Sequence, residues 1–580
     1  MPKDPAKPEV DEGTLEPDLP LSTQSADPST FKPLNLPYRE FQANNLPKTP
    51  VDLFEAFLPP SLIAKWAVYI ENDREKDLKA FKNDENAKKP LSHSTSLPEI
   101  YCFLASLIYI GLHKENSLRL YWSLASDRQP KHTLSLYISR NRFEDLYRHF
   151  AFWDPDYEDK GLPRLFSRVS EVSEIVRSTC KRFITIPLYI TIDESMIGFT
   201  GRSRITTLVK NKPTPVGFKV WTVGFEGYVL DWLWHFNHLG PVGIPFPSKK
   251  GAKKLAEKRP TDPSEELQQL SRLNDSQQVI ATLVRRLPQQ PYHLFHDNLF
   301  TSVSLSTYLR VYKGVGVTAT AREGSGIAKE LAEEYKKDRK QDRLPWNSLK
   351  AKATPDGLIQ QFIYKGNAST LFFSTVYAGD EPLVRVRRRR PNTKSGRAYF
   401  KDEGEKRVFV PAVVADYNHF KAGIDTANQL RSYNSWSHRI RRGREKCLFL
   451  QFILETVLCN TFLLQKWSGW QYKDQGSWRE AVLQGLFERY GSLSKAGTRG
   501  YSEVNSFKKR PSEHSYGFRG KCSTCKACLG YDISNQKRVV LGPSSGNRGG
   551  IRRQTSYGCL DCDVALCNNS YCMYKWHQQN

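Results

Sequence analysis

The run from Leu188 to Ile192 restricts the fold more than any other part of the sequence. Apolar and more polar side chains alternate here, which is the period of a strand with one buried face, and the run ends at Asp193-Glu194. Further strands are predicted over 219–224, 228–236, 292–296 and 316–320, with helices over 276–287 and 302–312. Because strands and helices follow one another in this order, the segment is expected to form an α/β domain.

The α/β pattern covers only part of a 580-residue chain, and this length predicts several folded units. Helical periodicity precedes the strands, and the run 447–467 is apolar on nearly every face, as in a buried helix. We therefore expect a multidomain α/β protein. Its predicted segments are a disordered acidic tail (1–50), a helical region (51–182), the first part of the α/β domain (183–320), an insertion domain (321–410) in which Trp346 is a core residue, the second part with the buried helix (411–467), a helical linker (468–510) and a Cys-rich domain (511–580).

The charge of the chain is strongly positive and unevenly distributed. The net charge is +25, whereas residues 1–60 carry five Lys and Arg against ten Asp and Glu, so the remainder holds about +30. Such an excess is typical of proteins that bind a densely negative partner such as nucleic acid. The densest basic runs are 387–390, 439–444 and 249–258. The alternative to DNA binding for such a run is a solvated loop or a nuclear-import signal, and for 249–258 we favour the solvated loop.

Seven of the eleven cysteines lie between 522 and 572. The N-terminus lacks a secretory signal and no apolar run is long and uncharged enough to span a membrane, so an intracellular protein with reduced thiols is expected. Cys-x2-Cys pairs hold two thiolates at the spacing of a tetrahedral zinc site, and two interleaved zinc ions are predicted. Their candidate ligands are Cys522, Cys525, Cys528, Cys559, Cys562, Cys567, Cys572 and His577. A ubiquitin-ligase RING or a reader of chromatin peptides would have a similar array.

Three aspartates stand where metal-dependent chemistry would place them. Asp193 and Asp297 end predicted strands, and Asp425 precedes a predicted helix. Phosphodiester cleavage uses two divalent cations about 3.5–4 Å apart, and Mg²⁺ prefers carboxylate oxygens. Taken singly, however, each aspartate fits a turn or a helix cap better than a metal site.

The sequence around these aspartates resembles the piggyBac family of transposases. The resemblance covers roughly residues 50–580, and it is the ordered combination of short motifs that makes it specific. These motifs are Tyr121-Trp122-Ser123, Asn141-Arg142-Phe143, Thr191–Met196, Gly198-Phe199, Gly201-Arg202-Ser203, Lys212-Pro213, Gly217–Trp221, Gly227–Asp231, His296–Ser302, Asp416-Tyr417-Asn418, Ala422–Asp425 and Gln429–Tyr433.

The resemblance implies an RNase H-like catalytic domain whose triad is Asp193, Asp297 and Asp425, holding two Mg²⁺ ions. It implies a homodimer in the nucleus that binds double-stranded DNA at terminal inverted repeats, excises through hairpin ends and inserts at TTAA. Asp416 does not match the catalytic position. The Cys-rich domain would bind transposon-end DNA, and His514 could replace Cys528 as a zinc ligand.

Two departures from the family pattern bear on activity. The family carries a further Asp three residues after the third catalytic one, whereas this chain has Asn428, a neutral group that can still ligate weakly. The Tyr-Met-Pro-like motif before Lys212 is replaced by Leu208-Val209-Lys210. The candidate DNA-binding residues are Arg202, Lys212, Lys219, Arg387, Arg388, Arg439, Arg441, Arg442 and Arg444. The main hypothesis is a cut-and-paste transposase; the alternatives are a domesticated DNA-binding protein without catalytic activity and a zinc interaction module on a large scaffold.

Overall fold

The structure is a computed structural model. It describes residues 30–83, 94–123, 132–154, 162–199, 201–210, 212–248, 253, 264–438 and 443–495, together with short strands beyond residue 515. The chain divides into two compact units, Met1–Gly497 and Thr498–Asn580. In the second unit the strands are β15 (Tyr516–Thr524), β16 (Leu529–Asp532), β17 (Lys537–Val540), β18 (Gln554–Cys559) and β19 (Val564–Ala565).

Within the described residues, ten strands of the first unit form one mixed sheet, in the order β10-β11-β12-β9-β8-β3-β5-β6-β7 with β4 paired to β5. Strand β3 is parallel to β8, and β8 is parallel to β9, whereas the other pairs are antiparallel. The bounds are β3 (Tyr189–Gly198), β4 (Thr207–Leu208), β5 (Val216–Phe225), β6 (Tyr228–Phe236), β7 (Gly240–Pro241), β8 (His293–His296), β9 (Gly316–Ala321), β10 (Leu349–Ala353), β11 (Gln360–Lys365) and β12 (Ser369–Ser374).

Strand β3 continues past Asp193-Glu194, where the sequence predicted that it would end. Its pairing with β8 reaches only Thr191, but its pairing with β5 continues to Gly198. At Asp193, therefore, the pairing of β3 with β8 has ended, whereas its pairing with β5 continues. The other strands and helices predicted over 219–320 agree with the structure apart from shifts at their ends.

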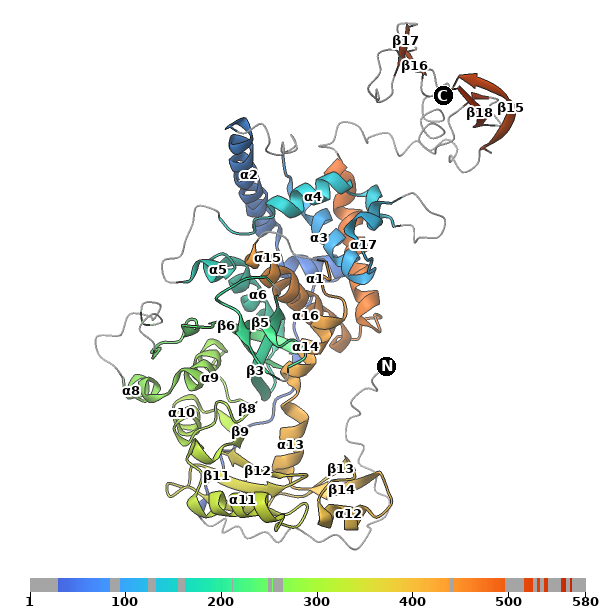
Figure 1. Cartoon of the computed structure of the whole chain (residues 1–580). Coiled ribbons are helices and arrows are strands. Elements are labelled where there is room, and N and C mark those ends of the chain that lie inside the picture. Colours follow the sequence, from blue (N-terminus) through green and yellow to red (C-terminus); the bar gives the residue numbers. More distant parts are fainter. Residues whose placement is uncertain are drawn as a thin grey trace. The chain divides into compact units, whose positions relative to one another are not determined.

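Helices surround the central strands, as Figure 1 shows. Before β3 they are α1 (Pro50–Phe57), α2 (Pro60–Asn83), α3 (Leu97–Leu112), α4 (Arg140–His149), α5 (Arg164–Ser167) and α6 (Ser170–Arg182), with 3₁₀ turns η2 (Leu118–Trp122) and η3 (Leu134–Leu136). After β7 come α8 (Glu265–Arg272), α9 (Asp275–Arg286), α10 (Val303–Lys313), η4 (Glu323–Ser325), α11 (Lys329–Gln341), α12 (Lys394–Phe400), α13 (Ala412–Phe420), α14 (Gly423–Tyr433), α15 (Arg444–Leu448), α16 (Leu454–Trp467) and α17 (Gln475–Lys495).

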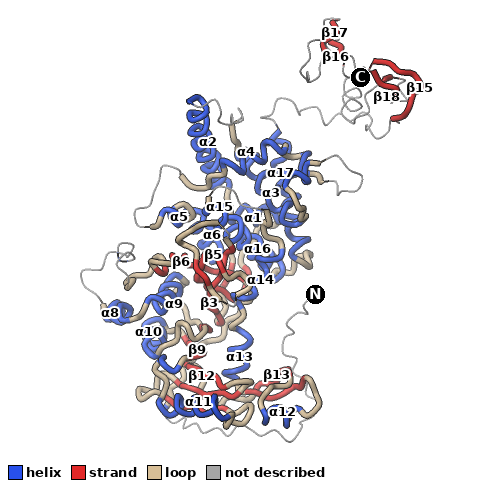
Figure 2. The backbone as a smooth tube through the Cα atoms, viewed as in Figure 1, coloured by secondary structure: helices blue, strands red, loops and turns tan. Residues whose placement is uncertain are grey.

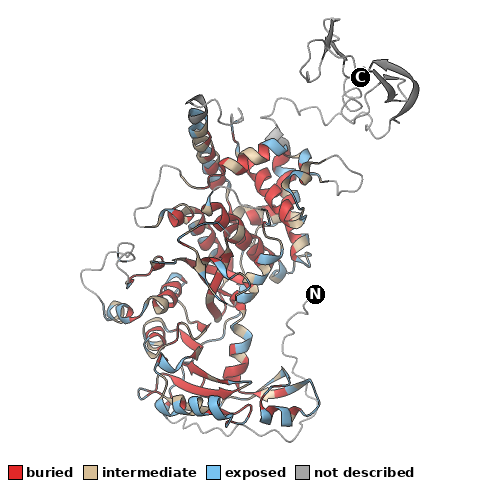
Figure 3. Cartoon of the chain, in the orientation of Figure 1, coloured by how far each residue is buried: buried red, intermediate tan, exposed pale blue. Residues whose placement is uncertain are grey.

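The helix α16 lies at the centre of the first unit, and Figure 3 shows its buried surface. It continues from α15 through a π-helical turn, η5 (Phe449–Ile453). The run Arg444–Trp467 is long and apolar enough to cross a membrane, but 94 % of its apolar window is buried inside the protein. Asn460 explains part of this placement, because its side chain bonds both the N–H and the carbonyl of Val229 in β6 (3.0 and 2.8 Å). The run is thus a core helix, as its all-round apolar sequence predicted.

Residues 349–374, predicted to lie in an insertion, extend the central sheet through the pairing of β12 with β9. Beyond them, β13 (Val384–Arg389) and β14 (Glu405–Val410) form a separate two-stranded ribbon. Figure 2 shows these strands below the central ones. Trp346 is buried beside Phe400, Val408 and Val410, so its predicted core role is confirmed.

Residues 30–49 do not follow the prediction of a disordered tail, while residues 1–29 lie outside the described part of the chain. Strand β1 (Gln42–Ala43) pairs with β2 (Ile184–Thr185), and the Arg39 guanidinium donates to the carbonyls of Ile186 and Pro291, both at 2.7 Å. The Phe41 ring lies 4.5 Å from that of Trp467. The segment is ordered because it adds backbone pairing and aromatic burial that its own composition did not reveal.

Candidate catalytic site

Asp193 and Asp297 occupy equivalent positions on two neighbouring parallel strands. Tyr189 of β3 is paired with His293 of β8, and Thr191 with Phe295. Each aspartate follows the last of these pairs by two residues. The carboxyl ends of parallel strands meet at one edge of a sheet, and this register therefore brings the two carboxylates to the same place.

The helix α14 brings the third carboxylate to this edge, with Asp425 in its first turn. The hydroxyl of Thr191 donates to the carbonyl of Phe420 (2.6 Å), and the N–H of Gly227 donates to the carbonyl of Gly423 (3.0 Å). A Cβ at Gly423 would lie 3.1 Å from the N of Glu226, so a larger residue would force the helix and the strand apart by a few tenths of an ångström. Asp425 is exposed, whereas Asp193 and Asp297 are partly buried.

The electrostatics of the site show a surplus of negative charge. Burial, followed by the charge of Glu194, raises the pKa of Asp193 to about 7, and Asp297 contributes in the same direction. Burial, with Glu194, also raises the pKa of Asp297. Buried carboxylates that resist ionisation in this way are typical of sites that take up a cation.

Lys212 and Lys219 partly offset this charge by pairing with Glu194, which was not among the predicted site residues. The Glu194 carboxylate lies 3.3 Å from Nζ of Lys212 and 3.5 Å from Nζ of Lys219. Burial opposes protonation of Lys212, but Asp193, Glu194 and Asp425 outweigh it and raise its pKa. The Lys219 ammonium also lies 3.8 Å from the centre of the Trp221 ring, and burial lowers its pKa. Lys219 is therefore better placed to hold Glu194 than to reach a phosphate.

The carboxylates suit a divalent cation by chemistry, since they are hard oxygen donors with unbalanced charge. Among the described residues, however, no three His, Cys, Asp or Glu side chains are grouped closely enough to hold a metal ion. The charge of Arg322 opposes the rise in the pKa of Asp297, and burial together with Asp297 and Asp193 raises the pKa of Tyr417, whose hydroxyl lies 3.1 Å from that of Thr320.

Asn428 of α14 is hydrogen-bonded to β3, the strand that carries Asp193. Its Nδ2 donates to the carbonyl of Glu194 (3.3 Å), and its Oδ1 accepts from the guanidinium of Arg431. Its Oδ1 thus already accepts one hydrogen bond, and the role of Asn428 in cofactor binding stays a prediction. Asp416, which the sequence excluded from the triad, accepts instead from the hydroxyl of Tyr377, shortly after β12.

The predicted DNA-binding residues are not gathered in one place. Arg202 is exposed shortly after β3, and Arg444 is half-buried at the start of α15. Arg387 and Arg388 lie on β13. Arg439, Arg441 and Arg442 fall outside the described residues, as does most of the run 249–258.

The predicted zinc ligands all belong to the second unit, and their side chains lie outside the described residues. Cys522 is in β15, and Cys559 in β18 is paired with Tyr516. The remaining candidates lie outside the described residues: His514, Cys525, Cys528, Cys562, Cys567, Cys572 and His577. The zinc assignment therefore stays a prediction.

Comparison with known proteins identifies the family. The family model described as Transposase IS4 matches residues 49–462. The human PiggyBac transposable element-derived protein 3 is 22 % identical over 552 residues, which cover 92 % of this chain and 77 % of the relative. The human PiggyBac transposable element-derived protein 2 is 27 % identical over 280 residues, 47 % of this chain and 40 % of the relative.

The fold also matches a solved structure, a synaptic complex of piggyBac transposase with hairpin DNA. The TM-score is 0.55 at 18 % sequence identity, and the match covers 78 % of this chain and 83 % of that one. The residues matched by the family model, 49–462, include all three aspartates. The chain belongs to the Transposase IS4 family, and within it to the piggyBac type.

Proposed function

We propose that the protein is a DNA transposase that cleaves DNA and transfers the cut strand at the edge formed by Asp193, Asp297 and Asp425. The observation that carries this proposal is the register of β3 and β8, which sets Asp193 and Asp297 side by side. Asp193 and Asp297 would hold divalent cations from the sheet, and Asp425 from α14. Bound Mg²⁺ would activate the attacking oxygen and stabilise the leaving one.

The strand arrangement supports an RNase H-like catalytic domain. The five central strands follow the order β6-β5-β3-β8-β9. The pairs β3-β8 and β8-β9 are parallel, whereas β5 is antiparallel to both β6 and β3. The protein's contribution would be geometric: the sheet fixes two carboxylates, and the close contact at Gly423 fixes the helix that carries the third.

The substrate in this proposal is double-stranded DNA carrying transposon terminal inverted repeats, with insertion at TTAA. The net charge of +25 supports a polyanionic partner. Lys212, beside the carboxylates, is partly exposed and can approach a phosphate, and Arg202 is exposed shortly after β3. A homodimer working in the nucleus, with two zinc ions in the Cys-rich domain, completes the proposal.

The test is cleavage of a labelled duplex carrying the transposon end, in Mg²⁺ and in EDTA, by the parent protein and by Asp193→Asn. Cleavage that requires Mg²⁺ and disappears in the variant is expected. Asp416→Asn is the matched control, because Asp416 is a partly buried carboxylate outside the triad. Cleavage that survives Asp193→Asn would refute the assignment.

A second candidate function is a domesticated DNA-binding protein without catalytic activity. The observation in its favour is that Asn428 replaces a family carboxylate and is engaged by Arg431. Specific binding of the end without cleavage, in Mg²⁺ or Mn²⁺, would favour this function over the first.

A further inference from the structure

The strands β13 and β14 form an antiparallel ribbon that pairs with no other described strand. Their register sets Arg387 opposite Arg407 and Arg389 opposite Glu405. Since side chains alternate along a strand, this register sorts the ribbon into two faces of different chemistry.

One face of the ribbon is packed against the protein. Val408 and Val410 are fully buried with Trp346 and Phe400, and Val386 packs on the same cluster. This packing determines the orientation of the ribbon and leaves its other face in solvent. Arg388 lies on the packed side and is only half-exposed.

The opposite face, which we call the arginine face, consists of Arg385, Arg387, Arg389, Glu405, Arg407 and Phe409. The side chain of Arg387 is 74 % exposed and that of Arg389 is 90 % exposed. Glu405 is the acidic member of the set and pairs with Arg387 and, at 3.4 Å, with Arg389. Exposed pairs of this kind contribute little energy, so four guanidinium groups against one carboxylate remain available to a polyanion.

The geometry of this face suits duplex DNA in particular. Alternate residues on a strand are about 6.7 Å apart, close to the rise of two phosphates along one DNA strand. The major groove admits a two-stranded β-ribbon. Arginine binds phosphates and base edges through its planar fork, which a lysine cannot reproduce.

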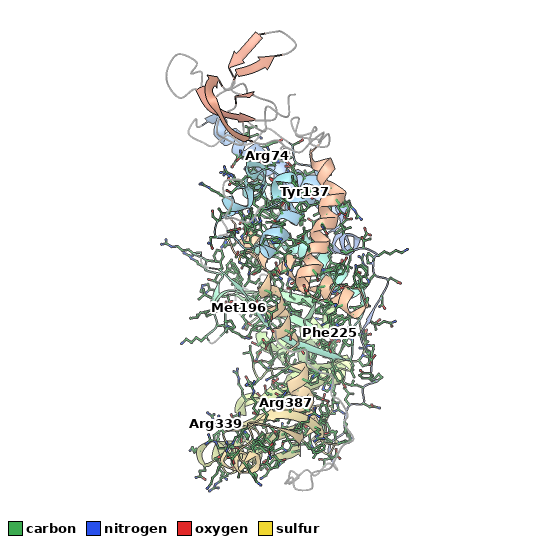
Figure 4. All side chains as sticks on the ribbon, turned by 90° about the vertical axis from the view of Figure 1, so that its right-hand side faces the viewer. Arg74, Tyr137, Met196, Phe225, Arg339 and Arg387 are labelled. Carbon is green, nitrogen blue, oxygen red and sulfur yellow. The ribbon has the colours of Figure 1, made fainter. Side chains whose placement is uncertain are left out.

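The ribbon is not the same site as the carboxylate edge. Figure 4 places Arg387 toward the lower end of the first unit, away from Met196 of β3. Figure 4 also labels Arg339 of α11, which lies in the same lower region and is one of the residues changed in the control variant below. A polyanion held by the ribbon would therefore be contacted at a point remote from the carboxylates.

We propose that the arginine face docks in the major groove of duplex DNA, through Arg385, Arg387, Arg389 and Arg407, while the carboxylate edge acts elsewhere on the same DNA. This inference rests on the proposed function and adds a DNA-contacting surface to it. Of the two residues predicted from the basic run, Arg387 and Arg388, the second lies on the packed side of the ribbon. Arg385 and Arg407 belong to the arginine face but were not among the predicted DNA-binding residues.

The test measures how the affinity for a labelled transposon-end duplex depends on salt, using full-length protein. All variants carry Asp193→Asn, so that binding is measured without cleavage. The triple variant Arg385→Gln, Arg387→Gln, Arg389→Gln is compared with a charge-matched control, Lys337→Gln, Arg339→Gln, Lys340→Gln, on the exposed side of α11. Both variants alter exposed residues, and equal melting temperatures would show that neither is misfolded.

We expect the ribbon variant to reduce the slope of log affinity against log salt by up to about 2.7, since each phosphate contact contributes about 0.9. The α11 control should leave the slope unchanged. Equal slopes for the ribbon variant and the parent, or equal losses in both variants, would overturn the ribbon surface while leaving the proposed function intact. Failure of the parent itself to bind duplex DNA would overturn the proposed function, and this inference with it.

Discussion

Asn428 and Arg431 form a hydrogen-bonded pair one turn apart on α14, on the side of the helix that faces β3. Arg431 also donates to the hydroxyl of Ser195 (3.1 Å), and its guanidinium lies 4.8 Å from the centre of the Phe452 ring. Burial lowers the pKa of Arg431 to about 10. Because Asn428 also donates to the carbonyl of Glu194, it connects the helix carrying Asp425 to the strand carrying Asp193.

The first prediction concerns Asn428. Asn428→Leu removes both hydrogen bonds and leaves the buried guanidinium of Arg431 without this acceptor, so the free energy of unfolding should fall by about 2 kcal/mol. Asn428→Asp restores an acceptor for Arg431 and should be markedly less destabilised than Asn428→Leu. Urea unfolding of both variants measures the difference, and equal stabilities of Asn428→Leu and the parent would show that the pair does not hold the helix.

The second prediction is a pH dependence due to Asp193, whose pKa is raised from 3.8 to about 7 by burial and by Glu194. Between these values the folded protein holds a proton that the unfolded chain has released, so the stability of the metal-free protein should fall as pH rises from about 4 to about 7. A tenfold difference in proton affinity between the folded and unfolded states corresponds to about 1.4 kcal/mol of stability.

Urea unfolding of the parent and Asp193→Asn, in EDTA at pH 5 to 8, measures this effect. The variant should gain stability relative to the parent with rising pH, and Mg²⁺ should stabilise the parent more at pH 8 than at pH 5. Parallel profiles of the two proteins would contradict the prediction.

The third prediction uses the close contact at Gly423. A methyl group there would meet the backbone of Glu226 and Phe225 at 3.1 and 3.3 Å, so Gly423→Ala must displace the start of α14 and with it Asp425. Because a misplacement of about 1 Å in a catalytic geometry can cost about 100-fold in rate, this smaller displacement should lower cleavage by less than that factor while DNA affinity is retained. Gly404→Ala is the control, since nothing lies within 4 Å of an added Cβ there. Unchanged cleavage by Gly423→Ala would show that the contact at Gly423 does not determine the position of Asp425.

The fourth prediction concerns the N-terminal segment. The Phe41 ring lies 4.5 Å from Trp467 and 6.2 Å from Phe225, so Phe41→Ala should lower the free energy of unfolding by about 2 kcal/mol. Tyr38→Ala should change it by less than about 0.5 kcal/mol, because Tyr38 is 67 % exposed. Thermal melting of both variants tests whether the segment stabilises the sheet, and a neutral Phe41→Ala would show that it does not.

Much of the fold could be predicted from local patterns. The strand Tyr228–Phe236 was predicted with these bounds and the helix Asp275–Arg286 within one residue at each end, because periodicity and turn residues are properties of neighbouring positions. The end of β3 was misplaced, because pairing with β5 rather than its own sequence keeps that strand extended to Gly198.

The sequence by itself determined the three aspartates and the family motifs around them, since these depend only on residue order. Tertiary structure decided which groups meet: the register that sets Asp193 beside Asp297, the two hydrogen bonds that engage Asn428, and the packing that turns Arg387 outward and Arg388 inward. These relationships join segments up to 234 residues apart, as between Glu194 and Asn428. Contacts over such separations depend on how whole elements pack, and no local periodicity records them.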